Sequence, residues 1–94
     1  YADGALASAL GKLKDELRFV LITSEARLAP LGEANGAEPT ELEGLLLHVD
    51  RTSHDKCVRC WHHRADVGAV AEHPELCGRC VENVTGAGER RLFA

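Results

Sequence analysis

Four cysteines in two close pairs constrain this chain more than any other feature of its sequence. The sequence has them as C-x2-C, sixteen intervening residues and a second C-x2-C, at Cys57, Cys60, Cys77 and Cys80. Each pair places two thiolates on one tight turn, so two pairs can complete a tetrahedron around a single Zn²⁺ ion. Four protein thiolates leave no open position for water or substrate, so the predicted cofactor is one structural zinc ion.

Three other uses of paired cysteines stay open at this point: two disulfides, a redox C-x2-C motif and an iron–sulfur site. Disulfides suit a secreted chain, but the N-terminus lacks the basic-then-apolar pattern of a signal peptide. A redox motif normally accompanies a βαβ pattern, which this sequence lacks. The spacing therefore favours zinc. The histidines His62, His63 and His73 are not expected to be ligands, because four cysteines already fill the tetrahedron.

Charge differs between the two halves of this 94-residue chain, whose formal net charge is -4. Residues 1–55 carry five basic and ten acidic side chains, a net -5, whereas residues 56–94 carry six and five, a net +1. Capture of nucleic acid by counterion release needs clustered Lys and Arg, which argues against broad electrostatic binding. The polar residues 50–56 mark the predicted boundary between a helix-and-strand subdomain, 1–55, and a four-cysteine zinc-binding module, 56–94.

Hydrophobic periodicity gives the expected elements of the first half. Leucines recur every three or four positions from Asp3 to about Leu17, which predicts an amphipathic helix with Asp3 as its N-cap. The β-branched and aromatic run at 18–24 predicts a buried strand, and residues 45–49 predict a second strand paired with it antiparallel. The predicted fold class is α+β, with this N-terminal helix and small antiparallel sheet followed by a four-cysteine zinc-ribbon or zinc-finger module.

The second half mixes aromatic, cationic and β-branched residues around Gly68, which predicts a zinc-ribbon β-hairpin between the cysteine pairs. Trp61 is interpreted either as a platform for an unstacked RNA base or as a lid packed on the metal turn. The lid is favoured, because a small module needs its large apolar side chains in the core.

Arg90 and Arg91 near the C-terminus could bind phosphate or simply be solvated. A nucleotide site is rejected, because no Lys-Ser/Thr follows the glycines at 86–88.

Longer stretches of sequence resemble a known family. The segments K-C-V-R-C-W-H-H at 56–63, L-C-G-R-C-V-E-N-V at 76–84 and G-A-G-E-R-R-L-F-A at 86–94 resemble the C-terminal zinc-binding, tRNA-binding region of bacterial isoleucyl-tRNA synthetases. Residues 13–26 resemble the segment that precedes this region, so the resemblance covers essentially the whole chain. Val58 stands where many relatives have Pro, which leaves the cysteines intact. Similar zinc fingers end some DNA-repair glycosylases, so the finger alone does not separate RNA from DNA.

The resemblance implies that the four cysteines ligate the zinc and that the module helps bind tRNA(Ile) near the anticodon. The family's ATP-dependent aminoacylation, the isoleucine–tRNA ligase reaction, takes place in domains absent here. The fragment alone is therefore not expected to be an enzyme, and no catalytic residue is predicted. The residues predicted to contact RNA, by phosphate or base-edge binding and by stacking, are Arg59, Trp61, His62, Arg64, Arg79, Arg90 and Arg91.

The expected partners are tRNA(Ile) and the remaining domains of the parent synthetase. No apolar run approaches the roughly 20 residues that a membrane-spanning helix needs. We therefore expect a cytoplasmic monomer in protein biosynthesis, without membrane contact. The alternative hypothesis is a purely structural or protein-docking zinc module that makes no direct contact with RNA.

Overall fold

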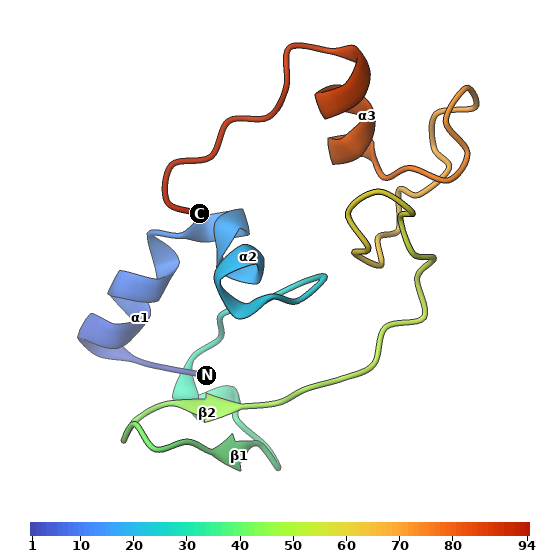
Figure 1. Ribbon diagram of the computed structural model, residues 1–94. Coiled ribbons are helices and arrows are strands. Elements are labelled where there is room, and N and C mark those ends of the chain that lie inside the picture. Colours follow the sequence, from blue (N-terminus) through green and yellow to red (C-terminus); the bar gives the residue numbers. More distant parts are fainter. The chain divides into compact units, whose positions relative to one another are not determined.

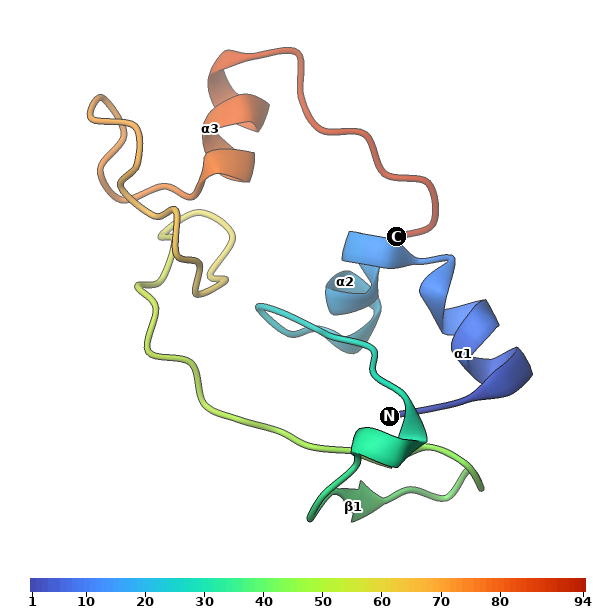
Figure 2. The same cartoon turned by 180° about the vertical axis from the view of Figure 1, so that it is seen from behind.

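The computed structural model describes residues 1–94, and the chain divides into two compact units. The first unit consists of Tyr1–Arg51 with Phe93–Ala94, and the second consists of Thr52–Leu92. Figures 1 and 2 show the elements of both units from opposite sides. Helices, a small antiparallel sheet and a four-cysteine cluster confirm the predicted α+β class.

The first unit begins with three short helices: α1, Gly4–Gly11; the 3-10 helix η1, Lys14–Glu16; and α2, Leu17–Leu21. The prediction of one continuous helix to Leu17 is wrong. Lys14 has a φ of 47°, in the left-handed region, and this interrupts the right-handed path. Asp3 is the N-cap residue of α1, but its side chain makes no capping hydrogen bond. Its carboxylate instead accepts the Leu31 backbone N–H at 3.1 Å.

The predicted strand at 18–24 is wrong, because α2 covers most of this segment and Ile22 ends it in the left-handed conformation. The Thr23 N–H donates back to the Arg18 carbonyl at 2.9 Å, and the Ile22 N–H donates to Phe19. These local bonds satisfy groups that would otherwise need a neighbouring strand. Phe19 is half-buried, but Val20, Leu21 and Ile22, which suggested a buried strand, stay exposed, and Ile22 is 89% exposed.

The sheet of the first unit has two strands, β1 at Glu38–Pro39 and β2 at Leu46–Leu47, which pair antiparallel. The β2 strand lies within the predicted strand at 45–49, but its partner is β1 instead of residues 18–24. The short 3-10 helix η2, Leu31–Glu33, precedes β1. The N-terminal ammonium group of Tyr1 donates to the Leu46 carbonyl at 2.7 Å, which ties the start of the chain to β2.

Little is buried in the first unit, where Ala2 and Leu17 are the buried apolar residues. The end of the chain adds polar contacts to the same unit. The backbone N–H groups of Phe93 and Ala94 donate to one carboxylate oxygen of Glu16, at 2.6 and 3.1 Å. The unit is therefore held as much by backbone hydrogen bonds as by an apolar core.

The second unit has one helix, α3 at Gly78–Thr85, and its other residues form turns and loops. The predicted β-hairpin between the cysteine pairs is wrong. An isolated bridge between Lys56 and His63 closes the first cysteine turn instead, and turns connect it to the second pair. Cys57, Cys77 and Cys80 are the buried residues of this unit, so its core is the cysteine cluster.

The helices of both units are too short and too polar for any of them to cross a membrane.

Replacing Leu17 by Ala should destabilise the first unit, because Leu17 is its one large buried side chain and is 8% exposed. We expect Leu17→Ala to lower the free energy of unfolding by about 2 kcal/mol or more. The matched control is Leu42→Ala, since Leu42 is 53% exposed. Urea titration followed through the NMR amide signals of residues 1–51 measures both. Equal losses for the two variants would contradict a core centred on Leu17.

Candidate metal centre

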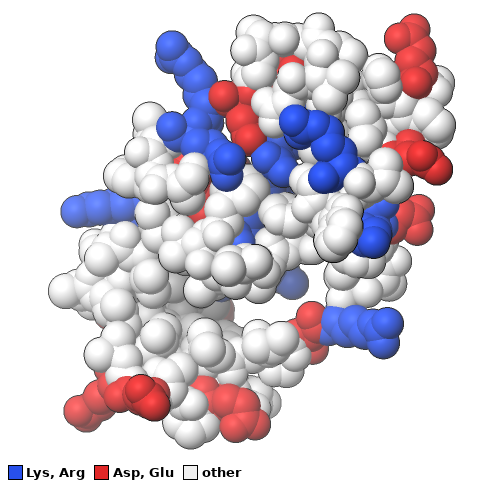
Figure 3. Space-filling view, in the orientation of Figure 1, with Lys and Arg blue, Asp and Glu red and all other residues white.

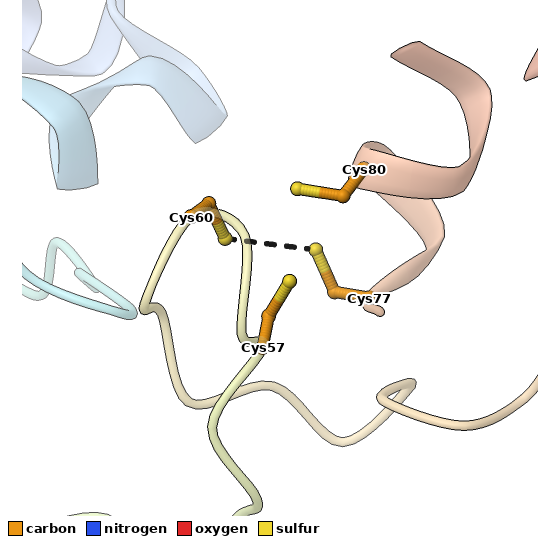
Figure 4. A group of neighbouring side chains, drawn as sticks. All are labelled: Cys57, Cys60, Cys77 and Cys80. Carbon is orange, nitrogen blue, oxygen red and sulfur yellow. Dashed lines mark hydrogen bonds between the residues drawn. The ribbon is translucent and has the colours of Figure 1, made fainter. Parts of the chain in front are cut away.

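The four cysteine side chains converge on one point, as Figure 4 shows. Cys57 and Cys60 come from the first turn of the second unit, and Cys77 and Cys80 come from the beginning of α3. All four sulfur atoms lie within 4.8 Å of one another. The cysteines are free thiols, so the two disulfides left open by the sequence do not form here.

The spacing of the sulfurs fits a tetrahedral metal ion. Four Zn–S bonds of about 2.3 Å place the corners of a regular tetrahedron about 3.8 Å apart. The sulfurs of Cys60 and Cys77 are 3.8 Å apart. Val67 and Leu76 pack against the cluster and cover part of it. The donor set is thus soft, shielded and of the right size for one zinc ion.

The first cysteine turn is closed by backbone hydrogen bonds around Cys57. Its N–H donates to the His62 carbonyl at 2.9 Å, and its carbonyl accepts the Trp61 N–H at 2.8 Å. Trp61 has a φ of 67°, a left-handed conformation that lets the chain reverse after the pair. This tight reversal turns the two thiols of the first pair toward the same side.

The second pair lies at the N-terminus of α3, which the sequence analysis did not predict. Cys77 is the N-cap residue and Cys80 lies in the first helical turn, so the three-residue spacing puts both thiols on one face. The pattern of apolar residues at Cys77, Cys80, Val81 and Val84 was a signal for this helix. It was missed because the second cysteine pair was interpreted only as a tight turn.

The surroundings of the cluster shift the pKa values of its thiols in opposite directions. Burial raises the pKa of Cys57, but backbone N–H groups from Cys60, Cys77 and Arg59 outweigh it and lower the pKa to about 6. Burial, together with contacts to the other thiols, raises the pKa of Cys77 to about 12. Burial also raises the pKa of Cys80. Four thiolates this close together need a metal cation to stay ionised.

Two arginines lie directly at the thiols. The Arg59 guanidinium donates to the Cys80 sulfur at 3.5 Å. This hydrogen bond is the main cause of the raised pKa of Arg59. Burial lowers the pKa of Arg79, but hydrogen bonds to Cys60 and Glu89 outweigh burial and raise it. Both residues were predicted RNA contacts, and the structure directs them to the cluster.

The other predicted RNA contacts are more dispersed. Trp61 is 70% exposed with the Lys56 ammonium 4.9 Å from its ring centre, so the favoured interpretation of Trp61 as a packed lid is wrong. It is wrong because the reversal at Trp61 leaves the indole outside the cluster. His62 and Arg64 are half-buried next to it in sequence. Arg91 lies 3.6 Å from Glu89, and Arg90 is exposed.

Histidines take no part in the cluster, which consists of cysteines alone. His63 instead makes a 2.8 Å hydrogen bond to the His54 carbonyl.

Charge on the surface follows the division of the chain. The second unit, Thr52–Leu92, has six basic and six acidic side chains, whereas the first unit has five and nine. In Figure 3 acidic side chains gather over the two strands of the first unit. The second unit would therefore repel a polyanion less than the first unit does.

The comparison with protein families defines the class of this module. Residues 55–83 match the family described as "Zinc finger found in FPG and IleRS". The match contains all four cysteines and the turns between them. Together with the tetrahedral spacing, it establishes a zinc-finger module whose cofactor is one zinc ion.

Curated relatives then identify the resemblance more closely. Over 95 aligned positions, covering all of this chain, it is 60% identical to the isoleucine–tRNA ligase of Pseudomonas putida and 59% to that of Stutzerimonas stutzeri. Identity to the isoleucine–tRNA ligase of Vibrio cholerae is 56%. The chain spans about 10% of the length of these relatives. No solved structure matches it. The predicted resemblance to the zinc-binding region of isoleucyl-tRNA synthetases is confirmed.

Gly68 supports the second cysteine pair from the loop before it. Its φ is +84°, its N–H donates to the Leu76 carbonyl, and a Cβ added there would lie 2.9 Å from the Pro74 carbonyl oxygen. We expect Gly68→Ala to destabilise the zinc-bound second unit by more than about 1 kcal/mol, because both the backbone angle and the contact resist it.

Gly88→Ala is the matched control, since Gly88 has a φ of +90° but only an ordinary contact at 3.5 Å. The Gly88→Ala variant has the same unfavourable backbone angle but no close contact like that with Pro74. Its free energy of unfolding should therefore fall less than that of Gly68→Ala. Urea unfolding monitored at the amides of residues 52–92 compares the two. If Gly88→Ala were equally damaging, the contact with Pro74 would not matter.

Proposed function

We propose that this chain is the C-terminal zinc-binding appendage of an isoleucine–tRNA ligase and that it helps bind tRNA(Ile) near the anticodon. In this proposal Cys57, Cys60, Cys77 and Cys80 hold one zinc ion. The ion is a structural cross-link, because four thiolates leave it no position for a substrate. ATP-dependent aminoacylation belongs to other domains of the cytoplasmic parent enzyme, and this segment supplies no catalytic residue.

The observation that carries the RNA proposal is the exposed indole of Trp61 beside Lys56. An aromatic face stacks on an unpaired base, and a neighbouring ammonium group can reach the phosphate. This pair lies on the zinc-supported turn, so the metal would hold the stacking surface in place. A monomeric module of this size would present one such surface to one tRNA.

Basic side chains of the second unit could extend this surface. Arg90 is exposed, and the Arg91 guanidinium lies 3.6 Å from the Glu89 carboxylate at the exposed end of the chain. Arg64 and His62 follow Trp61 in the chain. We therefore rest the RNA proposal on these residues, while Arg59 and Arg79 are engaged with the thiols.

A structural or docking role is the second candidate, and the exposed apolar residues of the first unit favour it. Val20, Leu21, Ile22 and Val49 are all at least half exposed. The relatives are about ten times longer than this chain, so other parts of a parent enzyme are available to cover such residues. Under this hypothesis the module would brace the parent without touching RNA.

A chemical-shift titration of the zinc-bound chain with tRNA(Ile) separates the two candidates. We expect salt-sensitive binding that shifts the Trp61 indole signal and weakens in the double variant Arg90→Ala with Arg91→Ala. Each lost phosphate contact should reduce the salt slope by roughly one. Lys12→Ala with Arg27→Ala removes the same charge from the first unit and serves as the control.

Each result assigns a role. Binding that survives loss of Arg90 and Arg91 but disappears with Trp61→Ala would restrict the surface to the first cysteine turn. No shift at any residue of the second unit would rule out direct RNA contact and leave the docking role.

A further inference from the structure

The two cysteine pairs are joined by arginines that cross between them. Arg59 and Arg79 occupy the same place in C-V-R-C and C-G-R-C, immediately before the second cysteine of each pair. Arg59 reaches from the first pair to the sulfur of Cys80 at 3.5 Å. Arg79, from the second pair, lies close enough to Cys60 of the first pair for that side chain to raise the pKa of the Arg79 guanidinium. Each guanidinium is thus directed toward a thiol of the opposite pair.

Arg79 is also held from its other side by Glu89. Its guanidinium donates to a Glu89 carboxylate oxygen at 2.6 Å, and the two side chains are only 18% and 23% exposed. Asn83 fixes Glu89 in turn. Its amide donates to the Glu89 carboxylate at 3.2 Å, and its carbonyl oxygen accepts the Glu89 N–H at 2.7 Å.

Charge explains why such contacts would matter. Four thiolates around one Zn²⁺ carry a formal net charge of about -2 in a shielded site. N–H donors on ligand sulfurs disperse this charge, and groups that orient metal ligands in this way typically change metal affinity by about 10- to 100-fold. Because each arginine is directed toward a different thiolate, removing either one leaves the negative charge of one thiolate less compensated.

We propose that Arg59 and Arg79 are outer contacts of the zinc centre that clamp the two cysteine pairs across the metal, and that Glu89 is the positioning residue for Arg79. This inference rests on the proposed assignment of the four thiolates as zinc ligands. It gives the two arginines a role in retaining zinc, separate from the RNA surface around Trp61.

Zinc affinity of the 94-residue chain, measured by competition with a chromophoric chelator, tests the clamp. We expect Arg59→Ala and Arg79→Ala each to lower zinc affinity by about 10-fold or more. Arg51→Ala is the control, because it removes an exposed arginine just before the second unit. Arg79→Lys should restore part of the affinity by keeping the charge while losing the planar fork.

The Glu89→Gln variant tests the positioning role. It should lower zinc affinity less than Arg79→Ala does, and it should add nothing in an Arg79→Ala background, because Glu89 acts through Arg79. In the cobalt-substituted chain, loss of an N–H···S hydrogen bond should shift the sulfur-to-cobalt charge-transfer band to lower energy. A merely structural variant would leave this band in place.

The zinc affinity of the unsubstituted chain is measured first, because it separates the proposed zinc site from the proposed role of the two arginines. Absence of tight zinc binding there would overturn the proposed ligand set and this inference with it. One tightly bound zinc, with both arginine variants equal to Arg51→Ala, would overturn only the clamp. If Arg79→Ala did not fold, the Arg59→Ala and Glu89→Gln affinities and their cobalt spectra would still decide the matter.

Discussion

Repulsion among four thiolates brought to one point is the constraint on which the second unit depends. The sulfurs lie within 4.8 Å of one another, and they form the buried core of a unit that has few other buried groups. Burial there raises the pKa of Cys77 to about 12, so the ionised cluster needs a compensating cation. A zinc ion would supply most of that charge, and the arginines that cross between the pairs would supply the rest. Metal binding then fixes both the turn that carries Trp61 and the beginning of helix α3.

The cysteine cluster could be predicted because its determinants are local. A C-x2-C spacing directs the two thiols of one turn toward the same side. Two such turns can then place all four thiols around one metal position. The orientation of Trp61 could not be predicted in the same way. Its exposure depends on a left-handed backbone angle at Trp61 itself, and a non-glycine residue gives little sign of such an angle in sequence. Helix α3 was missed for a related reason, since Gly78 is compatible with a turn as well as with a first helical position.

The first unit shows the limits of composition as a guide to strands. The β-branched run at 18–24 was predicted to be a strand, yet a strand needs a neighbour for its backbone groups. β2 pairs with β1, and the run forms α2 and a turn with its own local hydrogen bonds. Leucine spacing predicted helix at the N-terminus correctly, but not the break at Lys14. Exposed Val20, Leu21 and Ile22 are the residues on which a docking role within a longer enzyme would rest.

Metal content, combined with NMR spectra recorded before and after a strong chelator, tests the central claim most directly. We predict one zinc ion per chain and, on chelation, loss of the dispersed signals of residues 52–92. The signals of the first unit should largely persist, because its hydrogen bonds do not involve the cysteines. A chain without zinc, or a spectrum of residues 52–92 unchanged by the chelator, would contradict the account that a metal ion organises the second unit.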